Sequence, residues 1–144
     1  MIDPEGPTTF YIAGPMTGIK DNNVPAFDDA RDMLHSYGYV GISPADLDRA
    51  LGDYTEGTTA ENLANYMKRD LEQIAKADGI LLLVGWEGSQ GAQMELMVAL
   101  ICNLVIWIQV VDTRGEKQVI EARPTPDLFP IFAHILALNT EGTE

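Results

Sequence analysis

The hydrophobic residues of this chain form short apolar runs that alternate with longer segments in which apolar residues recur every three or four positions. The short runs are rich in β-branched and aromatic residues, and most are bounded by glycine, proline, serine or asparagine, which is typical of strands. We therefore predict strands at residues 8–13, 39–42, 79–84 and 104–108, and a short fifth strand at 118–120.

The longer segments have the 3.6-residue periodicity of helices that bury one face. They predict helices at residues 25–37, 59–77, 89–103 and 126–139. Pro25 suits a first helical turn, and Gly38 and Asn103 are typical residues at a helix end. Residues 46–57 are polar and contain glycine, so we expect a long loop or a short helical turn there, placed as a lid.

Strands that alternate with helices indicate βαβ units with right-handed crossovers. We expect one α/β domain over residues 1–144, a three-layer sandwich around a parallel sheet of roughly four or five strands. Ligands of such sheets bind outside the carboxyl ends of the strands. The loops after Ala13, Ile42 and Val84 would meet there.

The chain of 144 residues has a formal net charge of −13 and 46% hydrophobic residues. A surface this acidic repels a phosphate backbone, which argues against binding to DNA or RNA. A single phosphate is not excluded, because the amides at a helix N-terminus hold one without a basic surface.

Nothing in the sequence indicates export or a membrane anchor. The first residues are acidic and rich in turn formers, unlike a signal peptide, and Glu95, Asn103 and Gln109 interrupt the apolar stretch 94–111. Cys102 is the only cysteine and lies in an apolar run, so we expect a core residue and no internal disulfide. We expect a cytoplasmic protein.

Glu95 is the only charged residue between Glu87 and Asp112. An isolated carboxylate in an apolar segment is normally paired, hydrogen-bonded or directed into a cavity. Because the small-residue loop 88–92 precedes it, Glu95 is a candidate nucleophile or base at a pocket wall. A carboxylate that braces a neighbouring element explains the pattern equally well.

Asp70 lies at the edge of the apolar stripe of its helix, within roughly 40° of Ile74 around the axis. It is either a functional acid or, slightly favoured by geometry alone, a surface acid paired with Lys68, Arg69 or Lys76. Ser89 precedes a helix, where its hydroxyl caps the free amides or, in addition, helps to hold a ligand phosphate.

The loop after the first strand is Gly-Pro-Met-Thr-Gly, residues 14–18. It matches neither the dinucleotide fingerprint nor a P-loop. It is a turn that needs glycine for its backbone angles or, given its place at the sheet edge, part of a binding site. His35 and His134 are isolated, and we expect no metal site and no cofactor.

Three segments together resemble the nucleoside 2-deoxyribosyltransferase superfamily, over about residues 9–108. They are Tyr11-Ile12-Ala13-Gly14-Pro15-Met16-Thr17-Gly18, then Arg69-Asp70-Leu71 with Ala77-Asp78, then Ser89-x-Gly91-x-x-x-Glu95-Leu96-x-x-Ala99. The opening segment is most similar to an uncharacterised branch carried by phages and prophages. The pair Ser89 and Gly91 resembles the 2'-deoxynucleoside 5'-monophosphate N-hydrolases, in which this pair contacts the phosphate.

The resemblance implies a flavodoxin-like fold, a homodimer or larger homo-oligomer, and cleavage of an N-glycosidic bond without a cofactor. Glu95 matches the nucleophile, Asp70 the acid that assists the leaving base, and Tyr11 stands with them among the catalytic positions. The substrate-binding positions implied are Gly14, Pro15, Met16, Thr17, Gly18, Ser89 and Gly91. The sequence departs from the pattern at Thr17, where the nucleotide hydrolases have arginine, and at Met97, where many relatives have glycine.

These observations predict an N-glycosidase or deoxyribosyltransferase that acts on a 2'-deoxynucleoside 5'-monophosphate or a deoxynucleoside. The partner would be this small molecule, with no nucleic acid polymer and no membrane. The departures at Thr17 and Met97 keep open an alternative function, a non-catalytic protein that binds or senses a nucleotide on the same fold.

Overall fold

The computed structural model describes residues 5–51 and 59–122. Five strands, four α-helices and two 3-10 helices (η) are found in this part of the chain. In chain order they are β1 (Thr9–Ala13), η1 (Lys20–Asn23), α1 (Val24–Ser36), β2 (Val40–Ile42), α2 (Pro44–Leu51), α3 (Thr59–Lys76), β3 (Gly79–Leu82), η2 (Trp86–Gly88), α4 (Gln90–Ile101), β4 (Val105–Val111) and β5 (Lys117–Ala122).

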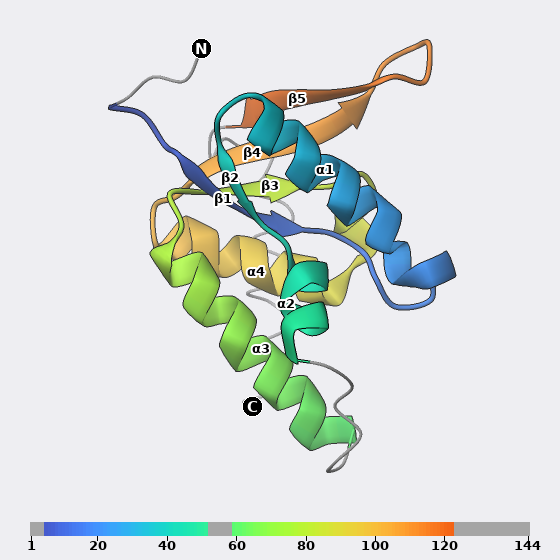
Figure 1. Cartoon of the computed structure of the whole chain (residues 1–144), viewed down its shortest axis with the longest axis vertical. Coiled ribbons are helices and arrows are strands. Elements are labelled where there is room, and N and C mark those ends of the chain that lie inside the picture. Colours follow the sequence, from blue (N-terminus) through green and yellow to red (C-terminus); the bar gives the residue numbers. More distant parts are fainter. Residues whose placement is uncertain (1–4, 52–58, 123–144) are drawn as a thin grey trace, which may run out of the picture.

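The strands form one sheet in the order β2-β1-β3-β4-β5 (Figure 1). Neighbours among β1 to β4 are parallel, with Tyr11 opposite Ile80 in the central pair. β5 is antiparallel to β4, because a short turn joins these two strands and leaves no length for a crossover. The mostly parallel sheet confirms the α/β sandwich predicted from the sequence. β4 extends to Val111, three residues beyond its predicted end at Ile108.

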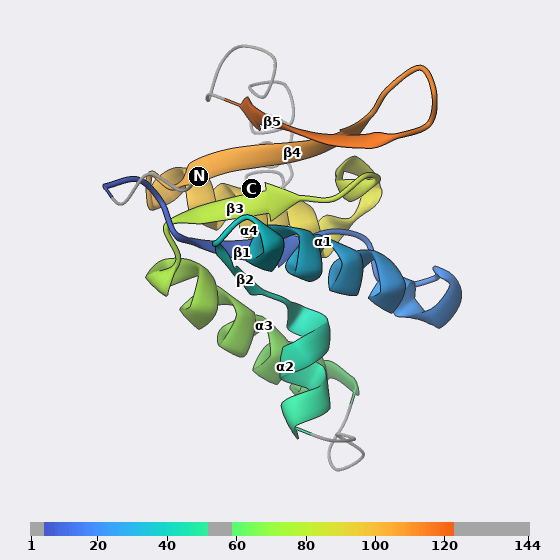
Figure 2. The same cartoon turned by 45° about the horizontal axis from the view of Figure 1, so that its top comes forward.

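Two apolar cores lie on opposite faces of this sheet, and α1 and α4 cover them (Figure 2). Successive residues of a strand point to opposite faces. Phe10 and Ile12 of β1 therefore pack with Phe27 and Leu34 of α1, whereas Tyr11 packs on the face of α3 and α4. The alternation directs the tyrosine hydroxyl toward the helices that carry the predicted acids.

Residues 46–51, within the segment predicted as a long loop or a short helical turn, are helical and belong to α2, which begins earlier, at Pro44. Ser43 and Pro44 begin a helix there: the Ser43 hydroxyl accepts a hydrogen bond from Ala45 N at 3.2 Å, and proline suits the first helical position. The pair that closes β2 thus also starts α2 at once. Residues 52–57 of the predicted loop lie outside the described residues.

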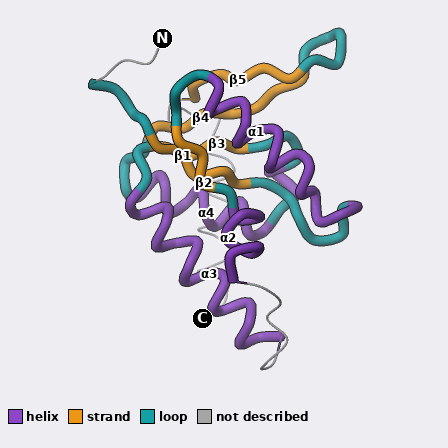
Figure 3. Tube along the Cα trace, in the orientation of Figure 1, coloured by secondary structure: helices purple, strands orange, loops and turns teal. Residues whose placement is uncertain are grey.

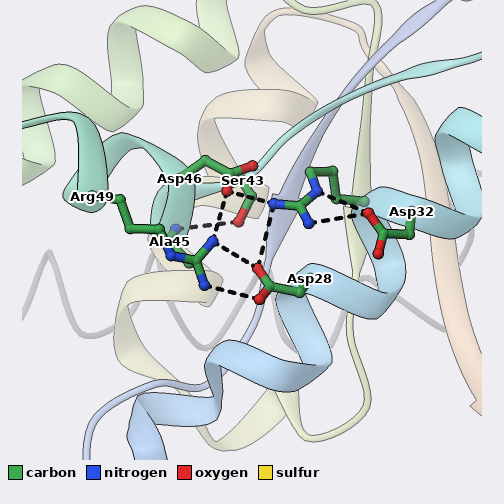
Figure 4. A network of polar contacts seen from close by, with 7 residues as sticks. Asp28, Asp32, Ser43, Ala45, Asp46 and Arg49 are labelled. Atoms are coloured by element: carbon green, nitrogen blue, oxygen red, sulfur yellow. Dashed lines mark hydrogen bonds and ion pairs between the residues drawn. The ribbon is translucent and has the colours of Figure 1, made fainter.

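Ion pairs fix α2 against α1 (Figure 4). Arg49 contacts Asp28 of α1 and Asp46 of its own helix, both at 2.8 Å, and Arg31 of α1 contacts Asp46 at 2.5 Å. Each pair is partly exposed, so each contributes little alone, but a shared network is more effective than separate pairs. The network therefore connects α2 to α1.

Several smaller predictions can also be compared with the structure. Cys102 is exposed at the C-terminal end of α4, which corrects its assignment to the core. Asn103 adopts a left-handed conformation (φ +58°) directly after the helix, as expected of a terminating residue. The predicted helix 126–139, with His134, lies outside the described residues. Within residues 5–51 and 59–122, no helix has both the length and the apolar composition needed to cross a membrane.

Gly14 permits a close approach between the chain after β1 and the end of β3. A Cβ atom at this position would lie 2.8 Å from the Cβ atom of Leu83. Gly18 has a positive φ (+81°), which favours glycine, whereas Gly14 is required for space.

Gly14→Ala should lower the free energy of unfolding by about 1–3 kcal/mol, because the added methyl group overpacks a buried contact. Urea unfolding followed by circular dichroism measures the change. Gly88→Ala is the matched control, because a Cβ atom there has open space around it. Equal stability of the two variants would contradict the steric explanation.

Candidate active site

A cleft of about 670 Å³ opens where β1 ends, between the N-terminal turn of α4 and the facing side of α3. The loop after β1, drawn in teal between the first strand and first helix of Figure 3, forms one side of it. Its lining residues are Tyr11, Gly14, Pro15, Met16, Thr17, Pro44, Tyr66, Met67, Asp70, Gly88, Ser89, Gln90, Gly91, Ala92, Met94 and Glu95. This position at the carboxyl edge of a parallel sheet is where the strand topology predicts a ligand.

Glu95 and Tyr11 form a hydrogen bond in the buried part of the cleft. The Tyr11 hydroxyl donates to Glu95 Oε2 at 2.5 Å, and only 7% of the Glu95 surface is exposed. The two residues are 84 positions apart and come from β1 and α4. The hydrogen bond fixes one carboxyl oxygen of Glu95. It also gives a hydrogen-bond partner to the hydroxyl of Tyr11, which is completely buried.

Burial raises the pKa of Glu95 to about 8. Loss of hydration disfavours the charged form most, and the negative charge of Asp70 acts in the same direction. The Tyr11 hydrogen bond and the positive charge of Arg69 favour the carboxylate and oppose this rise. The pKa of Tyr11 is raised well above its ordinary value, mainly by burial, so its hydroxyl keeps its proton.

Asp70 lies on α3, and its side chain is 15% exposed. Arg69 donates to Asp70 Oδ1 from Nε at 3.0 Å and from Nη2 at 2.8 Å. Burial raises the pKa of Asp70, and the contacts with Arg69 oppose that rise. The two sequence interpretations therefore describe one residue: Asp70 pairs with Arg69, as a surface acid would, and it also lines the cleft.

Ser89 begins α4 as its N-cap, as predicted. Its side-chain oxygen accepts a hydrogen bond from Ala92 N at 3.2 Å. Ser89 and Gly91 both line the cleft, so the first turn of α4 presents its amides and the positive end of its dipole there.

The structure brings together all but one of the residues that the sequence nominated. Gly18 does not line the cleft, and its positive φ serves the turn that follows. Sequence reasoning missed Tyr66 and Met67, which line the cleft from α3. They stand four and three positions before Asp70, and this spacing places side chains on one face of a helix, a signal that was present in the sequence.

The two carboxyl groups of the cleft have different surroundings. Glu95 is almost fully buried and is bound by a neutral hydroxyl, whereas Asp70 is bound by a guanidinium. Such a difference in surroundings separates the pKa values of two carboxyl groups that share one site. No group of three or more His, Cys, Asp or Glu side chains that could hold a metal ion occurs within residues 5–51 and 59–122.

A consequence of the Glu95 environment can be tested without any ligand. Between pH 4.5 and about 8 the folded state keeps the Glu95 proton and the unfolded state releases it, so stability falls as the pH rises. Glu95→Gln removes this ionisation and still accepts from Tyr11. It should increase the free energy of unfolding by on the order of 4 kcal/mol above pH 8, and by little at pH 4.5.

Thermal unfolding between pH 4.5 and 8.5 measures this difference. Glu72→Gln is the control, because Glu72 is an exposed carboxylate paired with Lys76 on the surface of α3. A stability gain for Glu95→Gln that does not grow with pH would contradict the assigned burial effect.

Comparison with known proteins gives a family and a fold. The sequence matches a family model described as "Domain of unknown function (DUF4406)" over residues 8–108. No curated protein sequence matches the chain significantly. Among solved structures, a 2-deoxyribosyltransferase from the psychrotolerant bacterium Bacillus psychrosaccharolyticus is similar with a TM-score of 0.57 and 22% identity, over 70% of this chain and 71% of that one. The likeness to this enzyme shows a shared fold. Because the family model spans most of the chain, the protein belongs to the DUF4406 family.

Proposed function

We propose that this protein cleaves or transfers the base at the N-glycosidic bond of a 2'-deoxynucleoside 5'-monophosphate, with Glu95 as nucleophile. The observation that carries the proposal is that Asp70 lines the same cleft, at the carboxyl edge of the sheet, as Glu95 and its hydrogen-bond partner Tyr11. A structure with the same fold is described as a 2-deoxyribosyltransferase, which supports the same class of reaction.

In the proposed reaction, an oxygen of ionised Glu95 attacks the anomeric carbon of the sugar. The carbon–nitrogen bond breaks, and the base leaves with the bonding electrons and takes a proton from Asp70. Water or a second base then attacks the same carbon, returns a proton to Asp70 and releases the Glu95 carboxylate. Two displacements give overall retention of configuration, as in retaining glycosidases.

Tyr11 supports this role through its contact with Glu95. Its hydroxyl holds Oε2, so the attacking oxygen is Oε1, which Tyr11 does not bind. A neutral hydroxyl donor favours the carboxylate over the protonated acid. Tyr11 therefore both orients the nucleophile and makes its ionisation easier in a buried site.

The first turn of α4 supports a 5'-phosphate on the substrate. The Ser89 oxygen accepts from Ala92 N, which leaves its hydroxyl proton available to donate to a phosphate oxygen. The backbone amides at the helix N-terminus are further hydrogen-bond donors. They hold a phosphate without lysine or arginine, which suits a protein with an acidic surface. The loop residues 14–17 face the same cleft and would contact the sugar and base.

The homo-oligomer expected from the sequence remains part of this proposal. Met94 and Ile101 of α4 are exposed, Ile101 by 72%, although the helix is apolar on most sides. A second copy that covered this helix would bury these residues, and Met94 also lines the cleft. The cleft would then lie next to the interface.

Glu95→Gln should reduce base release to less than a tenth of the wild-type rate, a loss of more than about 1.4 kcal/mol of transition-state stabilisation. Chromatography of free base after incubation with a panel of deoxynucleotides measures it. With an activated nitrophenol leaving group, which needs no proton, wild-type kcat/KM should rise with pH through about 8, because the free site must lose the Glu95 proton.

Retention of more than a tenth of the activity by Glu95→Gln would remove Glu95 as nucleophile. If wild type binds deoxynucleotides in a thermal-shift assay and releases no base, the protein is a nucleotide-binding or sensing protein. That alternative has its own support, since the raised pKa leaves Glu95 largely protonated near pH 7 and able to donate to a sugar hydroxyl.

Ser89→Asp tests the phosphate contact, because aspartate keeps the helix cap and adds a charge that repels phosphate. We expect at least a tenfold loss of affinity for a 5'-monophosphate and an unchanged affinity for the free nucleoside, measured by calorimetry. Ser89→Ala, which removes the hydroxyl alone, should show a smaller loss in the same direction. Equal binding of nucleoside and nucleotide by wild type would contradict a nucleotide substrate and favour a free-nucleoside transferase.

A further inference from the structure

Arg69 connects Asp70 to α2, a helix to which the sequence resemblance gives no role. Both of its hydrogen bonds to Asp70 are received by the same oxygen, Oδ1. Its remaining nitrogen, Nη1, lies 2.8 Å from Asp48 Oδ1 of α2. Its guanidinium carbon also lies 5.1 Å from the centre of the Tyr66 ring, within range of a cation–π contact. Arg69 is therefore held on three sides and is only 16% exposed.

Asp48 has a fixed position because α2 is anchored from its other side. Figure 4 shows Arg49 of α2 in contact with Asp28 of α1, and Asp46 of α2 pairs with Arg31 of α1. The chain of contacts thus runs from α1 through α2 and Asp48 to Arg69 and ends at Asp70. Arg69 itself does not line the cleft, whereas Asp70 does.

We propose that Arg69 is a positioning residue, held by Asp48 and Tyr66, that binds Oδ1 of Asp70 and so directs Oδ2 to the substrate. An oxygen that accepts two hydrogen bonds from a guanidinium is a poor place for a proton. The proton that Asp70 delivers to a leaving base would then be carried on Oδ2. The role of Asp70 in this inference rests on the proposed function. The Arg69–Asp70 contact does not depend on that function.

Charged and titratable groups face Asp70 from four elements. Arg69 of α3 lowers its pKa, and Asp48 of α2 raises it. The Tyr11 hydroxyl of β1 favours the ionised form, and Glu95 of α4 interacts with Asp70 through its charge. Loss of Arg69 should therefore raise the pKa of Asp70, and loss of the Asp48 charge should lower it.

Carbon-13 NMR titration of the Asp70 carboxyl in the free protein tests the contact without a substrate, with Asp70→Asn used to assign the signal. Arg69→Gln should raise the pKa of Asp70 by about one pH unit, and Asp48→Asn should lower it. Lys76→Gln is the matched control, because it removes a cation of the same helix whose ion pair is with Glu72 and not with Asp70, and it should leave that pKa unchanged. Asp48→Asn also decides the matter if Arg69→Gln fails to fold.

Kinetics then separate positioning from charge alone. Arg69→Lys keeps the positive charge, so the pKa of Asp70 should stay near the wild-type value. It loses the planar guanidinium whose two nitrogens donate to Asp70. We expect kcat for natural bases to fall about 10- to 100-fold in both Arg69 variants, with little change in KM, and activated leaving groups to be spared. Full activity of Arg69→Lys would overturn positioning in favour of a charge effect.

An equal pKa of Asp70 in Arg69→Gln, Lys76→Gln and wild type would also overturn the proposal. If the pKa shifts as expected but wild type releases no base from any substrate, the proposed function fails while the contact that orients Asp70 stands. The NMR and kinetic measurements therefore distinguish failure of the inference from failure of the function on which it builds.

Discussion

The burial of a carboxyl group on an apolar helix is the constraint around which this cleft is organised. Glu95 is almost without solvent, so its ionisation depends on what the protein supplies: a hydrogen bond from Tyr11 and the field of Arg69 against that of Asp70. An uncompensated carboxylate there would be costly, and a neutral side chain would be easier to bury. The proposed role of Glu95 as a nucleophile accounts for a glutamate at this position and for the tyrosine that β1 directs to it.

The parallel sheet supplies the geometry that the chemistry needs. β1 and β3 end side by side, and Gly14 permits the chain to leave β1 in close contact with Leu83. The alternation of β1 sends Tyr11 to the face covered by α3 and α4, where both acids lie. The same edge receives the N-terminal turn of α4, with its free amides and the Ser89 cap. The proposed nucleophile, the proposed acid and the proposed anion site thus meet at the edge where parallel strands end.

Ion pairs outside the cleft connect α1 to α2 and α2 to Arg69. The partly exposed pairs between α1 and α2 contribute little to stability one by one. Their effect is to fix α2, and with it Asp48, at the far side of Arg69. Three arginines, Arg31, Arg49 and Arg69, form ion pairs with aspartates of α1, α2 and α3. Thr17 is exposed and lines the cleft.

The sequence by itself determined the features that depend on local pattern. Periodicity and breakers placed the four parallel strands and the helices between them, Ser89 before a helix predicted its cap, and the isolation of Glu95 marked it as unusual. Tertiary structure alone decided what depends on residues distant in the chain: the bond from Tyr11 to Glu95, the exposure of Cys102 and the contact of Asp48 with Arg69. Local pattern reports the preference of a segment for helix or strand and for a buried face. Which side chains meet across elements is set by how those elements pack, and that information is distributed over the whole fold.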